Sequence, residues 1–486
     1  MLLRTTLIYA PAVLLTRVSA LVLLLFAARW MEKSEFGLLT LVVTVGEMTD
    51  LAVTSWLRIS LLRLGGNRAV SRGSLFRAAA ILTVTTACGL IVAVVAAEIL
   101  VSERAPQFAL AVCFYLVSGA VSRYAVIIVQ MQQRHAMYSM LEFLRALLQF
   151  ALSMAAMLLT AGSFLHVSLA SSLGALLAGF VALIVAFRVA VSGPPRFGYG
   201  EFLSLGIPIM VMAVAGFGLS NVERLFLKHY HDAAAVATFA AVYMLARQPL
   251  DLLANAINLG AFPEAVGRFD EEGAAAAGDL LSKLVALVLS LSLPAATLVI
   301  MAVDDLIVFL LPGSYSGSHG LPCALITFGT VCGILANFVY GTMIHAHKRP
   351  WLLVVSELAG SAVAVSMAVL IIPDLAIIGT AAVVAGAAFS NLAVFFIISK
   401  KLTPVPIPWE AISRAAMVAL ATGAAAWISK QALADGSAFE RLAATGMAGG
   451  VAFACLNAIF YPRASQEGLV WLQGAVQAVV KGKGKV

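Results

Sequence analysis

The chain has 486 residues, of which 62% are hydrophobic and only 11% are charged, and its formal net charge is +7. Apolar runs of about 20 residues recur along its whole length, and each is long enough to cross a bilayer as a helix. This composition excludes an ordinary soluble domain. The alternating pattern of barrel strands is missing. The five cysteines form no close pair, so we expect neither a metal site nor a disulfide framework.

Length and apolarity predict an all-α integral membrane protein with about fourteen transmembrane helices. The predicted spans are residues 5–30, 37–62, 76–101, 107–131, 137–161, 164–190, 203–229, 233–257, 279–303, 318–344, 350–373, 376–399, 408–430 and 441–461. All connections between them are short. The longest is expected at residues 260–278, so no segment outside the membrane could fold as a domain.

The basic residues are distributed unevenly between the two sides of these spans. With the N-terminus in the cytoplasm, twenty of the 31 lysines and arginines fall in cytoplasmic segments and six fall opposite, while five lie inside spans. Cytoplasmic loops carry such an excess, so we expect both termini in the cytoplasm and no nucleic-acid partner. Residues 463–486 combine apolar residues with three lysines, which predicts either a tail lying on the anionic membrane surface or a frayed end.

A weak internal repeat divides the chain. The first span opens with Tyr9-Ala10-Pro11 and the seventh with Gly206-Ile207-Pro208. Six spans separate them, so the two halves share an orientation, as in transporters that have a substrate site at the repeat interface. We therefore predict two six-helix lobes, residues 1–196 and 197–401, as a parallel pseudo-repeat around a central cavity. Two C-terminal helices follow within residues 402–462.

Charged residues inside the spans indicate the candidate site. Five arginines lie at membrane depth: Arg17, Arg123, Arg145, Arg224 and Arg247. A guanidinium there costs roughly 2.5–3.5 kcal/mol, so it normally faces a partner or a wet cavity. Arg17 and Arg247 lie at similar depth, one in each half. The alternative for two of the five is a local ion pair, Glu142 with Arg145 or Arg247 with Asp251.

The types of these residues suggest their chemistry. Arginine makes bidentate hydrogen bonds to phosphate oxygens and stays charged, which predicts a site for phosphate, pyrophosphate or carboxylate. Glu47 and Asp50 lie three apart on one helical face, and like charges that close favour a shared proton. With Asp251 they are candidates for coupling to a proton or cation. No P-loop, HExxH or GxSxG motif is present, so we expect no enzyme, no cofactor and no metal centre.

Short motifs resemble those of bacterial polysaccharide-biosynthesis flippases of the O-antigen type. The first half carries Arg17, Ala27-Ala28-Arg29-Trp30 and Glu35-Phe36-Gly37-Leu38. The second half carries Glu223-Arg224-Leu225-Phe226-Leu227, the segment Ala240-Ala241-Val242-Tyr243-Met244-Leu245-Ala246, and Phe262-Pro263. The family usually has Asp-Arg at residues 223–224 and Gly-x-Tyr at residues 237–239.

This resemblance implies membership of the multidrug/oligosaccharidyl-lipid/polysaccharide exporter superfamily. Such proteins have two six-helix lobes around a central cavity, and some have two further helices. It implies that the chain flips an undecaprenyl-pyrophosphate-linked oligosaccharide across the bacterial inner membrane by alternating access, for surface polysaccharide such as exopolysaccharide. In this family the first two helices of each lobe help to line the cavity. The residues carried over to it are Arg17, Glu47, Asp50, Arg224, Arg247 and Asp251.

Three other functions are compatible with parts of the sequence. A lipid II flippase also has fourteen spans. A multidrug/cation antiporter of the same superfamily is expected to have an acidic cavity, against which the five arginines argue. A membrane glycosyl polymerase or ligase is expected to have a sizeable outer loop, whereas the longest outer loop predicted here, near residues 304–319, is modest.

Overall fold

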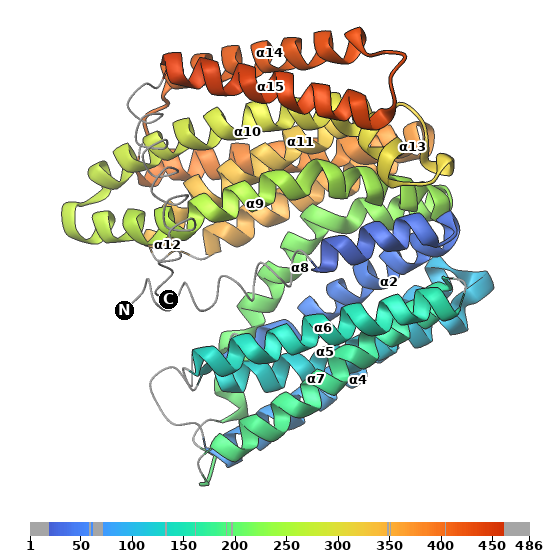
Figure 1. The fold of residues 1–486 in the computed structure, drawn as a ribbon. Coiled ribbons are helices and arrows are strands. Elements are labelled where there is room, and N and C mark those ends of the chain that lie inside the picture. Colours follow the sequence, from blue (N-terminus) through green and yellow to red (C-terminus); the bar gives the residue numbers. More distant parts are fainter. Residues whose placement is uncertain are drawn as a thin grey trace, which may run out of the picture. The chain divides into compact units, whose positions relative to one another are not determined.

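The computed structural model describes residues 19–57, 60–61, 71–131, 134–160, 162–190, 192–195, 198–347, 349, 351–403 and 405–460. Helices are the regular elements of these ranges (Figure 1). They are α2 (Lys33–Asp50), η1 (Leu51–Ser55), α4 (Arg72–Leu100), η2 (Ser102–Arg104), α5 (Ala105–Met131), α6 (His135–Leu159), α7 (Phe164–Val189), α8 (Tyr199–Tyr230), α9 (Ala233–Glu272), α10 (Ala274–Leu310), η3 (Gly313–Tyr315), α11 (Gly320–Ile334), η4 (Leu335–Tyr340), α12 (Gly341–Ala346), α13 (Trp351–Leu402), α14 (Trp409–Ala432) and α15 (Ala438–Phe460).

The prediction of a multi-pass, all-α membrane protein is confirmed. Among the described residues, 11 helical segments are long and apolar enough to cross a membrane. The helix Ser19–Trp30 and α8 lie in two further predicted spans. Helix α13, one of the 11 segments, covers two predicted spans, because its backbone breaks at Ala376, where φ is 43°. Each of the fourteen predicted spans therefore contains a helix among the described residues.

One connection differs from the sequence prediction. Residues 260–278 were expected to form the longest loop, but α9 continues to Glu272 and α10 begins at Ala274. Only Gly273 interrupts the helices, with φ of 90°, a conformation that glycine adopts at little cost at the end of a helix. Apolarity ends near residue 260, but helix-forming alanine and glutamate continue. The hydrophobic pattern therefore marks where the apolar run ends, not where the helix ends.

The chain divides into two compact units. Unit 1 is Met1–Met244 with Leu310–Ser314 and Pro350–Asn391, and unit 2 is Leu245–Phe309 with Tyr315–Arg349 and Leu392–Val486. Each unit combines segments that are far apart in the sequence. The predicted lobes, which divide at residues 196 and 401, stay a prediction.

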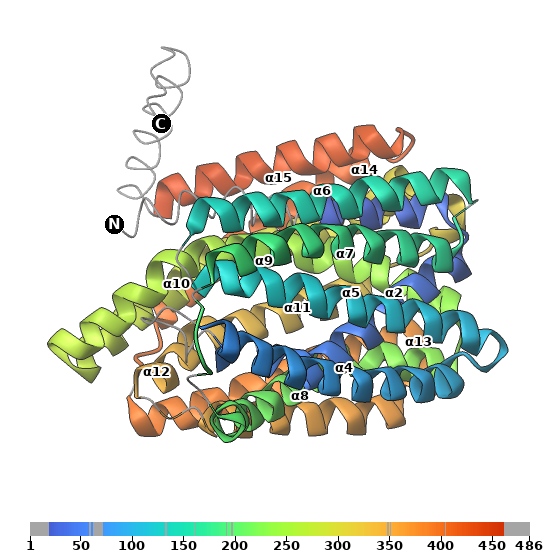
Figure 2. The same cartoon turned by 90° about the horizontal axis from the view of Figure 1, so that it is seen from below.

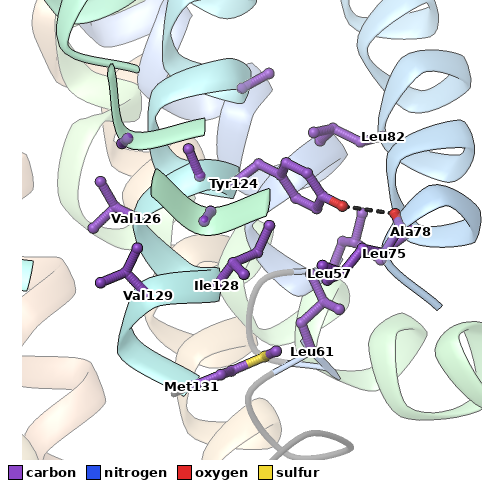
Figure 3. Packing of buried hydrophobic residues seen from close by; sticks show 14 of the residues in the cluster. Leu57, Leu61, Leu75, Ala78, Leu82, Tyr124, Val126, Ile128, Val129 and Met131 are labelled. Atoms are coloured by element: carbon purple, nitrogen blue, oxygen red, sulfur yellow. Dashed lines mark hydrogen bonds between the residues drawn. The ribbon is translucent and has the colours of Figure 1, made fainter. Parts of the chain in front are cut away.

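Unit 1 is built around α5. This helix packs against α7, α4, α2 and α6, and α6 also packs along α7 in both views (Figures 1 and 2). Fully buried alanines such as Ala125 and Ala182 allow the helices to approach closely, as is usual where lipid supplies no hydrophobic drive between helices. In the buried cluster that includes Leu57 and Ile128, the Tyr124 hydroxyl donates a hydrogen bond of 2.6 Å to the Leu75 carbonyl (Figure 3).

The Glu35-Phe36-Gly37 motif has a packing role at the start of α2. Glu35 forms an ion pair with Arg104 and accepts a hydrogen bond of 2.7 Å from the backbone N–H of Phe164, the first residue of α7. A Cβ at Gly37 would lie 1.8 Å from the carbonyl oxygen of Ala233, at the start of α9. The motif therefore joins the ends of several helices of unit 1.

Unit 2 holds the two C-terminal helices. Helices α14 and α15 pack side by side, and Gly423 and Gly449 let them approach Thr297 and Leu298 of α10. Asp305 of α10 is 3% exposed. Its carboxylate pairs with Lys430 at 2.8 Å and with Arg441 at 2.7 Å. One buried carboxylate thus ties both C-terminal helices to α10.

Candidate functional site

The candidate site of unit 1 begins with one face of α2. Thr44, Glu47 and Asp50 follow one another at three-residue spacing, so their side chains share a face. Asp50 is only 2% exposed, whereas Glu47 is exposed although it lies within an apolar span. Immediately after Asp50 the helix widens into the π-helical turn η1, a distortion that is frequent at functional sites. The Thr54 hydroxyl in this turn donates a hydrogen bond to the Asp50 carboxylate.

Arg123 of α5 joins this face from the neighbouring helix. Its Nη2 lies 3.0 Å from Oδ1 of Asp50, and its guanidinium also hydrogen-bonds Tyr115. A Cβ at Gly119 would lie 2.1 Å from Nη2 of Arg123, and a Cβ at Gly46 would lie 2.5 Å from the Tyr115 ring. The two glycines therefore leave the space in which Arg123 lies along its helix and reaches Asp50.

Arg224 reaches the same face from α8. Its guanidinium carbon lies 4.7 Å from the centre of the Tyr243 ring, and its Nη1 lies 3.5 Å from the Thr44 hydroxyl. Its Nε is 4.0 Å from a carboxylate oxygen of Glu223. Among the described residues, this buried Nε has no hydrogen-bond partner.

Electrostatic interactions connect these groups into one cluster. Arg224 and Arg123 attract the Glu47 carboxylate, while Asp50 repels it. We call Glu47, Asp50, Arg123, Glu223 and Arg224 the α2 charge network. It contains three carboxylates and two guanidiniums, so its own residues already compensate the arginines. An anion that enters it must replace a carboxylate or bring a positive charge.

The other predicted site residues lie elsewhere. Arg145 pairs with Glu142 of its own helix, and Arg247 pairs with Asp251 at 2.8 Å, also on its own helix. These are the two local ion pairs that the spacing left open as alternatives. Arg247 and Asp251 belong to unit 2, and Arg17 lies outside the described residues. The convergence of Arg17 with Arg247 stays a prediction.

A further carboxylate lies in unit 1 on α13. Glu357 lies beside Asn391, which is fully buried, and its Oε2 would be 3.5 Å from a Cβ at Gly216 of α8. Within the described ranges, no lysine or arginine forms an ion pair with Glu357. No group of three or more potential metal ligands occurs in the same ranges.

Sequence reasoning missed the residues that position the arginines. Tyr115, Gly119 and Arg123 lie four apart on one face of α5, so the helical period alone contained this signal. Tyr243 lies in a segment that resembled the flippase family, but nothing in that segment indicated a ring beneath Arg224. Contacts between helices depend on packing, which spacing along one helix does not reveal.

Comparison with known proteins places the chain in a family. Residues 2–266 match the model of the family described as polysaccharide biosynthesis protein. No curated protein matches the chain by sequence. A solved structure of the lipid II flippase MurJ in an inward closed conformation is similar, with a TM-score of 0.73, 12% identity, and coverage of 94% of this chain and 99% of that one.

A multidrug resistance MATE family transporter of the MOP superfamily, solved in an inward-facing conformation, is also similar. Its TM-score is 0.51 at 13% identity, with 79% of this chain and 94% of that chain covered. These likenesses show that the chain has the fold of known flippases and transporters. The family match includes every residue of the α2 charge network and extends over more than half of the sequence. The chain is therefore a member of the polysaccharide biosynthesis protein family.

Proposed function

We propose that the protein flips an undecaprenyl-pyrophosphate-linked oligosaccharide across the bacterial inner membrane by alternating access, for export of a surface polysaccharide. Family membership supports a role in polysaccharide biosynthesis, and the fold supports a carrier. The observation that carries the proposal is the α2 charge network, where Arg123 and Arg224 come from different helices to one acidic face within the membrane.

The chemistry of the network fits a pyrophosphate head group. Guanidinium groups bind phosphate oxygens through paired, charge-assisted hydrogen bonds, and they stay charged at membrane depth. Arg224 is the residue through which we expect the pyrophosphate to be bound, because its buried Nε lacks a hydrogen-bond acceptor among the described residues. Arg123 has a different role in this proposal, since Asp50 and Tyr115 already hold it. Arg17, Arg145 and Arg247 are proposed as further contacts to the substrate.

The carboxylates suit coupling to a cation or proton. With three carboxylates against two guanidiniums, binding of an anion inside the membrane adds negative charge that the site cannot compensate. Uptake of a proton or cation by Glu47 or Asp50 would restore the balance. Asp251, which is paired with Arg247, is the corresponding candidate in unit 2. Flipping forms and breaks no covalent bond, so the proposal needs neither a catalytic residue nor a cofactor.

Complementation tests this function. In a strain that lacks the gene, the wild-type protein should restore surface polysaccharide, and Arg224→Gln should fail to do so at equal protein level. Arg268→Gln is the matched control, because Arg268 forms an exposed pair with Glu264 at 3.1 Å and belongs to unit 2. Lysis on depletion, with loss of peptidoglycan precursor flipping, would instead assign the protein to lipid II.

The same strain tests the proposed orientation. Both termini are proposed to lie in the cytoplasm of a multi-pass inner-membrane protein. Fusions of a reporter that is active only in the cytoplasm should be active at either terminus. An active periplasmic reporter at either end would contradict this orientation.

A further inference from the structure

The two arginines of the α2 charge network are held in different ways. Arg123 has a close carboxylate partner, Asp50, and a second hydrogen bond to Tyr115. Asp50 is 2% exposed and also accepts a hydrogen bond from Thr54. An ion pair with this many partners and so little exposure is part of the packing between α2 and α5, and a ligand would have to break several bonds to enter it.

Arg224 and Glu47 attract each other without being bonded. Glu47 is exposed, and within the described residues it makes no hydrogen bond and no ion pair within 4.0 Å. Arg224 has only long contacts to oxygen, 3.5 Å to Thr44 and 4.0 Å to Glu223, and its Nε is unsatisfied among those residues. A buried donor without an acceptor is costly, so an acceptor that enters between α2 and α8 gains the bond that Glu47 does not make.

The surroundings of Arg224 favour a phosphoryl group as this acceptor. Tyr243 covers one face of the guanidinium, which leaves its edges for oxygen atoms. The Thr44 hydroxyl accepts a long contact from Nη1 and donates its proton to the Thr40 carbonyl at 2.8 Å. It can donate to a phosphoryl group only if it gives up the bond to Thr40. Glu47, one turn along α2 from Thr44, would repel a phosphoryl group while it is ionised.

From this arrangement we infer that Arg224, Thr44 and Tyr243 form a phosphoryl subsite for which Glu47 is the exchangeable counter-ion, while the Arg123–Asp50 pair stays intact during transport. This inference rests on the proposed function. It adds that Arg224, and not Arg123, exchanges its carboxylate partner for the phosphoryl group. In the empty carrier Glu47 and Glu223 together compensate the charge of Arg224. When a phosphoryl group binds, Glu47 gives up this role and takes a proton. The groups that face Glu47 are Arg224 of α8, Arg123 and Tyr115 of α5, and Asp50 of α2.

Binding of inorganic pyrophosphate to the purified full-length protein in nanodiscs tests the inference. Glu47→Gln should lower the Kd roughly tenfold, the scale expected for removing a nearby, partly screened like charge. The wild type should bind more strongly at low pH, and Glu47→Gln should remove this dependence. Glu410→Gln, which removes a carboxylate from an exposed pair at the start of α14, should leave both properties unchanged.

A double-mutant cycle tests the subsite at Arg224 and the exchange of Glu47 separately. Arg224→Gln should abolish binding, and Glu47→Gln should then have no effect in that background. An unchanged or raised Kd for Glu47→Gln, with a normal thermal unfolding curve, would overturn the exchange and leave Arg224 as a substrate contact. Unchanged pyrophosphate binding by Arg224→Gln would overturn the subsite. The proposed function fails separately, if deletion of the gene leaves surface polysaccharide unchanged.

Discussion

Arg123 and Asp50 form an ion pair of 3.0 Å between two membrane-spanning helices, α5 and α2. Helix α5 holds no carboxylate, and the basic residue of α2, Lys33, lies at the opposite end of that helix from Asp50, so the pair depends on how the helices pack. It also lies directly before the π-helical turn η1. This pair holds Arg123 and Asp50 of the α2 charge network in place. Arg224 and Glu47 are not bonded to each other and can change partners.

Removing one partner of this pair should destabilise the protein. Arg123→Gln leaves Asp50 buried without its cation, and such a loss costs about 3–5 kcal/mol. We expect a clearly lower Tm in detergent for Arg123→Gln and for Asp50→Asn. The double variant should recover much of the loss, because no charge is left unpaired. Equal Tm values for the wild type and both single variants would mean that the pair contributes nothing to packing.

Gly119 should matter through the space that it leaves for Arg123. A methyl group at this position would lie 2.1 Å from Nη2 of Arg123, so Gly119→Ala should move the guanidinium away from Asp50. We expect a lower Tm and reduced polysaccharide export, both smaller than the effects of Arg123→Gln, because the flexible guanidinium shifts and weakens its pair with Asp50 but is not removed. Gly446→Ala is the matched control in α15, where a Cβ meets nothing within 4 Å. Alanine there should be neutral or slightly stabilising.

Gly37 also lies in close contact with another helix, but there the neighbouring atom belongs to the backbone. A methyl group on its Cα would lie 1.8 Å from the backbone oxygen of Ala233, which cannot rotate aside. Gly37→Ala should therefore separate the starts of α2 and α9, at a cost of about 1–3 kcal/mol for overpacking. Thermal unfolding would show a lower Tm. A Tm equal to that of Gly446→Ala would show that the two helix ends are not in this close contact.

Asp305 should hold the C-terminal helices to α10. Asp305→Asn leaves Lys430 and Arg441 without their shared carboxylate, so α14 and α15 should become easier to detach. Limited proteolysis should cut the variant within residues 403–409 or 433–437 faster than it cuts the wild type. Glu410→Gln, which affects only an exposed pair, should be cut at the wild-type rate. No increase for Asp305→Asn would contradict the role of this carboxylate.

Much of the fold could be predicted because a bilayer demands long apolar helices. The break of α13 at Ala376 was expected between the spans 350–373 and 376–399, since the apolar run is too long for one crossing. The connection at residues 260–278 was predicted wrongly as a loop, because helix propensity outlasts apolarity there. Membrane hydropathy measures only the part of a helix that lies in lipid.

The candidate site could be predicted in part. The shared face of Glu47 and Asp50, and the local pairs of Arg145 and Arg247, follow from helical spacing alone. The pairing of Arg123 with Asp50 does not, since it depends on which face of α5 meets α2. The sequence also suggested five arginines available to an anion. Two of them are compensated by their own helices, so the described site is less cationic than the residue count implies.

The most direct test of the account is flipping in proteoliposomes. Purified protein would be reconstituted with an undecaprenyl-pyrophosphate-linked oligosaccharide, and transbilayer movement would be followed by the access of an external sugar-modifying enzyme to the lipid. The account predicts movement with the wild type and with Arg268→Gln, and none above protein-free vesicles with Arg224→Gln. Equal movement with Arg224→Gln and the wild type would contradict it.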